Sequence, residues 1–226
     1  MIYITGDTHI PTIDIQKLGS KRFSAQKSLS KNDFILICGD FGGVWDGSNE
    51  EKYWLKWLNE KNFSTLFIDG NHENFDMLNQ YETEMFGGGL SHKITESVRH
   101  LMRGYIFEFC GVRIFAFGGA SSHDRTCRTE GQNWWKEELP SKQEIEQARK
   151  VLSEYGNEID VILTHCAPSS IQKVIAPEME INALTDFFEE IKNMVNYKKW
   201  FFGHYHIDEV IDEKHIAVFN EIIPLK

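Results

Sequence analysis

Five short strings in this 226-residue chain place Asp, Asn or His beside a glycine or at the end of an apolar run. They are GDTH (6–9), GDFGG (39–43), GNHE (70–73), THCAP (164–168) and GHYH (203–206). Carboxylate and amide oxygens and imidazole nitrogens bind divalent metals. If the strings meet in the fold, they supply enough ligands for two ions: Asp7, His9, Asp40, Asn71, His165, His204 and His206.

Two neighbouring divalent ions could share one ligand and leave positions open for water and substrate. A carboxylate can bridge ions about 3.5–4 Å apart, and we assign that role to Asp40. Metal coordination can lower the pKa of a bound water to about 7. Mixed nitrogen and oxygen donors with open positions suit Mn²⁺, Fe²⁺ or Zn²⁺. We expect Mn²⁺, with the other two as alternatives.

The strings follow apolar runs that are typical of buried strands. These runs are residues 2–5, 34–38, 65–68, 160–164 and 199–202. Helical patterns lie between them at 50–62, 141–155 and 182–197. Because strand and helix alternate, the sequence predicts an α/β fold with every ligand on a loop at the end of a strand.

Two hairpins and two loops interrupt this alternation. Residues 105–109 and 112–117 are joined by Cys110-Gly111, which predicts an antiparallel hairpin and hence a mixed sheet. Runs 209–211 and 216–219 predict a second hairpin. Surface loops are expected at 87–89 and at 121–140. The second is long enough that we expect it to have a function.

The ordered strings resemble the calcineurin-like metallophosphoesterase superfamily, whose pattern is D-x-H, G-D-x-x-D, G-N-H-E/D, H and G-H-x-H. The resemblance covers essentially the whole chain. It implies a four-layer αββα sandwich of two mixed β-sheets with the metals at the strand ends. It also implies that His72 is the catalytic histidine, which would protonate the leaving group. The implied ligands are Asp7, His9, Asp40 and His206 for the first metal, and Asp40, Asn71, His165 and His204 for the second.

One residue departs from the family pattern: the second Asp of G-D-x-x-D is Gly43 here. In relatives that have it, this Asp orients the catalytic histidine. A histidine acts better as an acid when a partner fixes its tautomer and ring orientation. Asp46, Asp69 and Asp124 are the candidate substitutes, and for Asp124 a solvated loop carboxylate is an equally good interpretation.

Composition sets limits on the partners. With 41% hydrophobic residues, we expect one calcineurin-like metallophosphoesterase domain over residues 1–226. The net charge of −10 disfavours binding of extended nucleic acid. No apolar run approaches the length of a membrane span, and a predicted strand begins at residue 2, which leaves no room for a signal peptide. We therefore expect a cytoplasmic protein that does not enter membranes.

The expected substrates are small phosphomonoesters or phosphodiesters, including nucleotides. Phosphoprotein phosphatases of the superfamily carry arginines where this chain has Val44 and Asp69. The loop at 121–140 could contact a substrate through Asp124, Arg125, Arg128 and Trp134, with Trp135 and Lys136 close by. Tryptophans there could stack on a base, although aromatic side chains more often serve packing. The alternatives are a nuclease of the same fold and a non-catalytic scaffold.

Overall fold

The computed structural model describes residues 1–225 and contains two mixed β-sheets that pack face to face. The first sheet has the order β13-β1-β2-β3-β6-β5-β4. Its strands are β1 (Ile2–Thr5), β2 (Phe34–Ile37), β3 (Ser64–Phe67), β4 (Thr83–Phe86), β5 (Gly89–Lys93), β6 (Val98–Leu101) and β13 (Ile223–Leu225). The second has the order β11-β12-β10-β9-β8-β7. Its strands are β7 (Tyr105–Phe109), β8 (Val112–Phe117), β9 (Glu158–Thr164), β10 (Asn196–Phe202), β11 (Glu209–Val210) and β12 (His215–Ala217).

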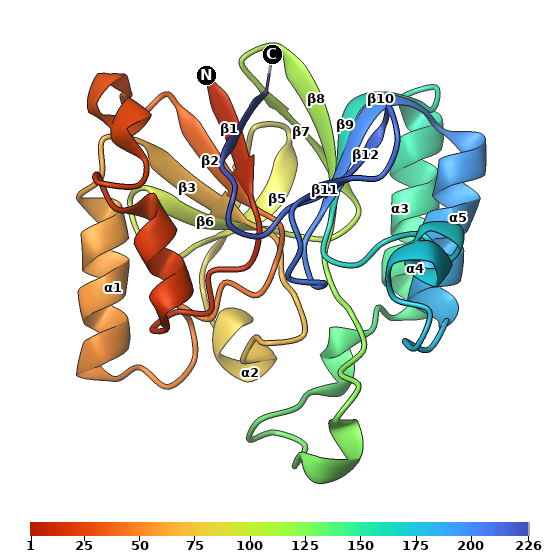
Figure 1. Cartoon of the computed structure of the whole chain (residues 1–226), viewed down its shortest axis with the longest axis horizontal. Helices are drawn as coiled ribbons and strands as arrows, with labels where there is room; N and C mark the ends of the chain where they lie inside the picture. Colours follow the sequence, from red (N-terminus) through yellow and green to blue (C-terminus); the bar gives the residue numbers. More distant parts are fainter. Residues whose placement is uncertain (226) are drawn as a thin grey trace.

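Helices cover the outer face of each sheet (Figure 1). The α-helices are α1 (Asn49–Asn59), α2 (Phe75–Leu78), α3 (Lys142–Glu154), α4 (Ser169–Ile175) and α5 (Ala183–Met194). Helix α1 lies on the first sheet, whereas α3 and α5 lie on the second. Short 3-10 helices cover Ile13–Leu18, Ser24–Ser28, Arg125–Cys127 and Lys136–Glu138. No helix within residues 1–225 is both long enough and apolar enough to cross a membrane.

Three apolar layers hold these elements together. Leu36 of β2 and Leu163 of β9 lie in the layer between the sheets. Ile35 and Ile37 point the other way, toward α1. Because neighbouring residues of a strand face opposite sides, a strand buried on both faces is apolar throughout. The prediction of a four-layer αββα sandwich with two mixed sheets is confirmed.

Parallel strands occupy the middle of each sheet and bring the loops that follow them together. β1, β2, β3 and β6 are parallel neighbours, as are β8, β9, β10 and β12. Thr5, Ile37 and Phe67 stand side by side in register at the ends of their strands. The loops after β1, β2 and β3 therefore leave the first sheet at one edge.

The predicted hairpins are present. β7 pairs with β8 through the turn at Cys110-Gly111, where both residues have positive φ. β11 pairs antiparallel with β12. The triglycine loop proves to be the turn between β4 and β5, because Phe86 pairs with Gly89.

The prediction of a helix over 182–197 was wrong at its C-terminal end. α5 stops at Met194, and β10 begins at Asn196, which pairs with Glu158 of β9. Tyr197 is buried there, and its hydroxyl lies 2.9 Å from Nε2 of His215. Pairing with a distant strand overrides the local helical pattern at these residues. The α2, α4, β4, β5, β6 and β13 elements were not predicted.

Candidate metal centre

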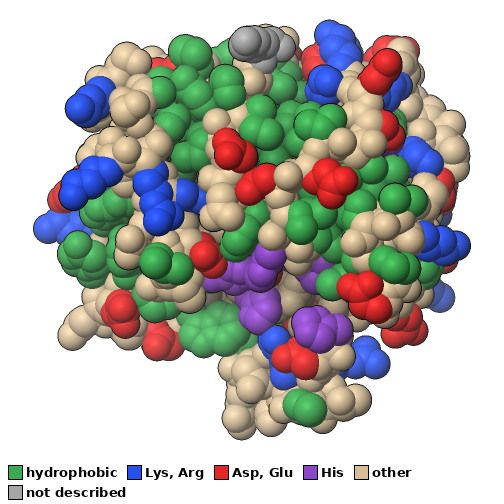
Figure 2. All heavy atoms as spheres, in the orientation of Figure 1, with side chains coloured by type: hydrophobic (Ala, Val, Ile, Leu, Met, Phe, Trp, Pro, Cys, Tyr) green, Lys and Arg blue, Asp and Glu red, His purple; other side chains and the backbone are tan. Residues whose placement is uncertain are grey.

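The predicted ligands lie together, at the edge where loops from the two sheets meet. Figure 2 shows histidine side chains gathered in the middle of one face. Below them protrudes the segment 121–140, which is green in Figure 1. Two groups have donor atoms all within 4.8 Å of one another, Asp7 with His9 and His206, and Asp7 with Asp40 and His165. Strands from opposite sheets thus supply one cluster.

Asp40 belongs to the second group and also contacts His9 of the first. Its Oδ2 is 3.2 Å from Nε2 of His9, and its Oδ1 is 3.2 Å from Nε2 of His165. The Asn71 carbonyl oxygen lies 3.3 Å from that same His165 nitrogen. The two oxygens of Asp40 therefore face different imidazoles, which is the arrangement that a bridging ligand needs.

Asp7 holds the loop that carries the last two histidines. Its Oδ2 lies 3.2 Å from Nε2 of His206, and both of its oxygens accept the backbone N–H of His204 at 3.2 Å. The ring of His204 packs against that of His165, with centroids 4.9 Å apart. All of the predicted ligands thus lie in or beside this cluster.

Two imidazoles are oriented by partners behind them. Nδ1 of His9 lies 2.9 Å from Oδ2 of Asp14, and Nδ1 of His165 lies 2.6 Å from the Cys38 carbonyl oxygen. In both cases an N–H at Nδ1 donates to the oxygen, which leaves Nε2 free to bind a metal. Asp14 was not predicted from the sequence, where no pattern marked it as a partner of His9.

Small residues make room for the carboxylates. A Cβ on Gly70 would lie 2.0 Å from Oδ1 of Asp40, and a Cβ on Gly203 would lie 2.1 Å from Oδ1 of Asp7. The backbone is also unusual, because His9, Asp40, His204 and His206 all have φ between 37° and 70°. Such left-handed conformations are costly for these residues and cluster at functional sites.

The charges of the centre favour a cation. Burial would raise the pKa of the Asp40 carboxyl, but His165 and His9 hold this pKa well below its usual range. Burial disfavours the charged form of His165, yet Asp40 and Asp7 outweigh burial and raise its pKa to about 10. Both carboxylates are almost fully buried. Buried carboxylates with imidazole nitrogens and an amide oxygen around them fit divalent metal ions, which would take the place of the proton on His165.

Two further buried titratable side chains, Glu73 and Lys17, brace the loops that carry the candidate ligands. Oε1 of Glu73 accepts the backbone N–H of Phe41 at 2.7 Å, just after Asp40. Nζ of Lys17 donates to the Asp7 carbonyl oxygen at 2.7 Å and also to that of Phe219. Neither role was predicted, because the partners are set by tertiary structure.

The structure explains why Gly43 replaces the family's Asp. A Cβ at this position would lie 2.5 Å from the ring of Phe41. That ring is fully buried and stacks on Phe67 at a centroid distance of 4.0 Å. An Asp at position 43 would therefore require the core beneath it to move.

None of the three candidate carboxylates replaces that Asp. Asp46 accepts the Ser48 N–H at 2.9 Å, Asp69 pairs with Arg103 and His100, and Asp124 pairs with Arg128 at 2.7 Å. Within residues 1–225, no hydrogen bond to the His72 ring is found. Its backbone N–H donates to Oδ1 of Asp40 at 2.8 Å. Burial chiefly lowers the pKa of His72, and the guanidinium of Arg128 adds to this.

The segment 121–140 places its candidate residues differently. Arg128 is largely buried and lies close enough to His72 to influence its charge. Arg125 lies over the ring of Trp134, 5.6 Å from its centroid. Trp135 is buried, and its indole N–H donates to Asp76 of α2 at 2.8 Å. Trp135 thus serves packing, the alternative to base stacking.

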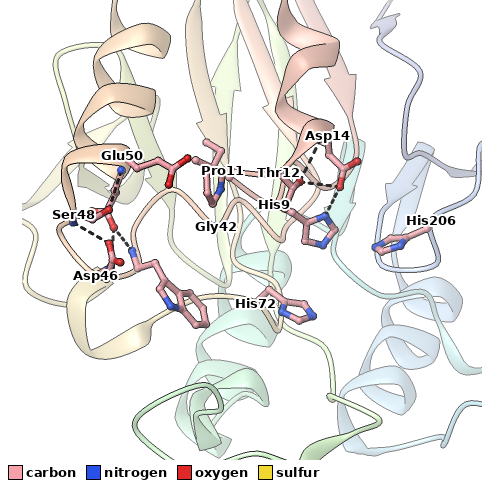
Figure 3. Close-up of a pocket in the computed structure, with 13 residues that line it drawn as sticks. His9, Pro11, Thr12, Asp14, Gly42, Asp46, Ser48, Glu50, His72 and His206 are labelled. Atoms are coloured by element: carbon pink, nitrogen blue, oxygen red, sulfur yellow. Dashed lines mark hydrogen bonds and ion pairs between the residues drawn. The ribbon is translucent and has the colours of Figure 1, made fainter.

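Two cavities flank the centre. The first has a volume of about 570 Å³ and includes His9, His72 and His206 in its lining (Figure 3). The second, of about 560 Å³, is lined in part by His204, His123 and Arg125. Both are large enough for a small-molecule group. Asp124, Arg128 and Trp134 are not among the lining residues of either cavity.

Glu138 connects the segment 121–140 to Asn71, one of the predicted ligands. Its Oε2 accepts the Ser122 N–H at 3.0 Å, and the Ser122 hydroxyl oxygen accepts from Nδ2 of Asn71 at 3.3 Å. This leaves the amide oxygen of Asn71 turned toward His165. Oε1 of Glu138 has no hydrogen-bond partner within the described residues. Burial raises the pKa of Glu138 to about 7.

We expect Glu138→Gln to stabilise the protein at alkaline pH. Because the folded pKa exceeds the unfolded value, the native state binds more protons between about pH 4.5 and 7. Glu138 therefore costs stability increasingly as pH rises through that window. Urea unfolding in EDTA should show the variant more stable than the native chain by about 2 kcal/mol at pH 8, and by less at pH 5. An equal gain in the free energy of unfolding at pH 8 and at pH 5 would contradict this explanation.

A sequence profile of the calcineurin-like phosphoesterase family matches residues 1–208. The chain therefore belongs to this family. No match was found among curated proteins. One similar solved structure is a Staphylococcus aureus protein provisionally named a 5′-nucleotidase, in complex with α-ketoglutarate, with a TM-score of 0.49 and 16% identity. The alignment covers 96% of this chain and 48% of that one, so this chain spans about half its length.

Proposed function

We propose that this protein is a metal-dependent hydrolase of small phosphomonoesters or phosphodiesters, including nucleotides. The observation that carries the proposal is the convergence of the seven candidate ligands, Asp40 among them, in one cluster with His72 beside them. The first ion would be held by Asp7, His9, Asp40 and His206, and the second by Asp40, Asn71, His165 and His204. Family membership supports phosphoester chemistry, and Mn²⁺ is the metal we expect.

Two bound ions would neutralise phosphoryl oxygens and lower the pKa of a water to about 7, which makes hydroxide available for attack. Other groups of the protein orient the side chains that would hold the ions. Asp14 and the Cys38 carbonyl fix the tautomers of His9 and His165. His72 lines the first cavity, which supports the proposal that it gives a proton to the leaving oxygen.

The test compares four substrates after removal and return of metal. The protein is stripped with EDTA, reloaded with Mn²⁺ and assayed on p-nitrophenyl phosphate, its bis ester, cyclic nucleotides and DNA. We expect hydrolysis of small esters with Mn²⁺ and none in EDTA. Faster cleavage of DNA would instead establish a nuclease. Two bound metals without activity on any phosphoester would establish the scaffold alternative.

A further inference from the structure

The cavity beside His72 has two distinct ends. Figure 3 shows His9, His72 and His206 at one end, and Asp46, Ser48 and Glu50 at the other. Because His72 is the proposed proton donor, the leaving group of a bound phosphoester must lie on its side of the phosphorus atom. The first cavity is therefore the space that a leaving group would fill.

One wall of this cavity is apolar and rigid. It contains Ile10, Pro11 and Trp45. The backbone of Trp45 is fixed at both ends, since its N–H donates to Oε2 of Glu51 at 2.6 Å and its carbonyl accepts from Asn74 at 2.6 Å. Its ring packs edge-on against the buried Trp135 at 5.5 Å. A preformed apolar wall favours an apolar group without a cost of ordering.

The charged groups of the lining are acidic. Four carboxylates line the cavity, and no Lys or Arg does, among residues 1–225: Asp14, Asp46, Glu50 and Glu51. Glu51 accepts three backbone N–H groups and Asp14 faces His9, so these two are engaged. Glu50 is exposed at the start of α1 and makes no ion pair in the described part of the chain. The far end of the cavity is therefore negative.

We propose that the natural substrates are phosphoesters of alcohols that present an apolar face to Trp45 and carry no negative charge of their own. This inference rests on the proposed function, because it takes His72 as the proton donor. Water is the co-reactant. Its oxygen forms the new bond to phosphorus, the bond from phosphorus to the leaving oxygen breaks, that oxygen takes the proton of His72, and the proton lost by water restores His72.

A matched series of aryl phosphates tests the inference: phenyl phosphate, 4-carboxyphenyl phosphate and 4-(aminomethyl)phenyl phosphate. With the Mn²⁺-loaded protein, we expect kcat/KM for the carboxyl compound to be about tenfold below that for phenyl phosphate, because like charges repel. The kcat/KM for the aminomethyl compound should equal or exceed that for phenyl phosphate. 4-Carboxyphenol is a slightly better leaving group than phenol, so leaving-group ability alone would make the carboxyl compound react faster. A slower reaction would therefore be due to the negative charge of the cavity.

Two variants localise the effect. Glu50→Gln should reduce the difference in kcat/KM between phenyl phosphate and 4-carboxyphenyl phosphate. Glu60→Gln is the matched control, since Glu60 follows the same helix, pairs with Lys56 at 3.7 Å and does not line the cavity. It removes the same charge and should leave the ratio of the two kcat/KM values unchanged.

Three outcomes would overturn a claim, and they can be told apart. Equal or faster hydrolysis of the carboxyl compound by the native protein would refute the inference while leaving the proposed function intact. An equal effect of Glu50→Gln and Glu60→Gln would refute the role of this cavity. No hydrolysis of any aryl phosphate, of the bis ester or of cyclic nucleotides with two metals bound would refute the proposed function itself.

Discussion

Replacing Asp40 by Asn is expected to lower the rate of phosphoester hydrolysis by about three orders of magnitude or more. Its two oxygens face His9 and His165 at 3.2 Å each, so Asp40 contacts one proposed ligand of each ion. The amide that replaces it is neutral and keeps one acceptor oxygen. Loss of a metal contribution of several kcal/mol corresponds to this loss of rate. Bound Mn²⁺ per chain should fall as well.

Asn suits this test because it preserves the local backbone. Asp40 has a φ of 47°, a conformation that Asn adopts more readily than most residues. The Asn oxygen can still accept the His72 N–H, which lies 2.8 Å from Oδ1 of Asp40. We therefore expect the variant to fold, and circular dichroism would show this. The change should act on metal binding rather than on the sheet.

Metal content and activity are measured together. The matched control is Asp160→Asn, near the start of β9 and therefore at the opposite end of that strand from His165. It should retain the native amount of Mn²⁺. If Asp40→Asn kept both full metal content and native turnover, Asp40 would not be a bridging ligand.

The positions of the candidate ligands could be predicted because they lie where apolar strands end. Asp7, Asp40 and Asn71 follow parallel neighbours, and the ends of parallel strands meet at one edge of a sheet. The supporting residues could not be found in that way. Lys17 contacts Phe219, which is 202 positions away, and Glu73 contacts Phe41 through the folded loops. Their charges resemble surface charges until the fold buries them.

The limits of the fold prediction have the same cause. The end of α5 was misplaced because β10 gains its first residues by pairing with β9, a contact that local periodicity does not contain. β4 was missed because it is a short, partly exposed edge strand. Such a strand lacks the continuous apolar run of the central ones. That residues 1–226 form one domain stays a prediction.

Replacing His72 by Asn is expected to separate proton transfer from metal binding. Loss of a positioned general acid costs about 10²- to 10⁴-fold in rate when the leaving group is poor. Phenyl phosphate should show this loss, whereas p-nitrophenyl phosphate should show less, because nitrophenolate leaves without a proton. The backbone N–H of residue 72 still donates to Asp40, so bound Mn²⁺ should stay at the native level.

The dependence on the leaving group, rather than the loss of rate alone, decides the role of His72. A change that merely distorted the metal centre would slow both esters equally and lower the metal content. His123→Asn is the matched control, since His123 is exposed and lines the cavity on the other side of the centre. It should leave the ratio of the two rates unchanged. If His72→Asn lost the same factor in rate on both esters and kept its metal, His72 would instead bind the phosphoryl group. The leaving oxygen would then take its proton from water.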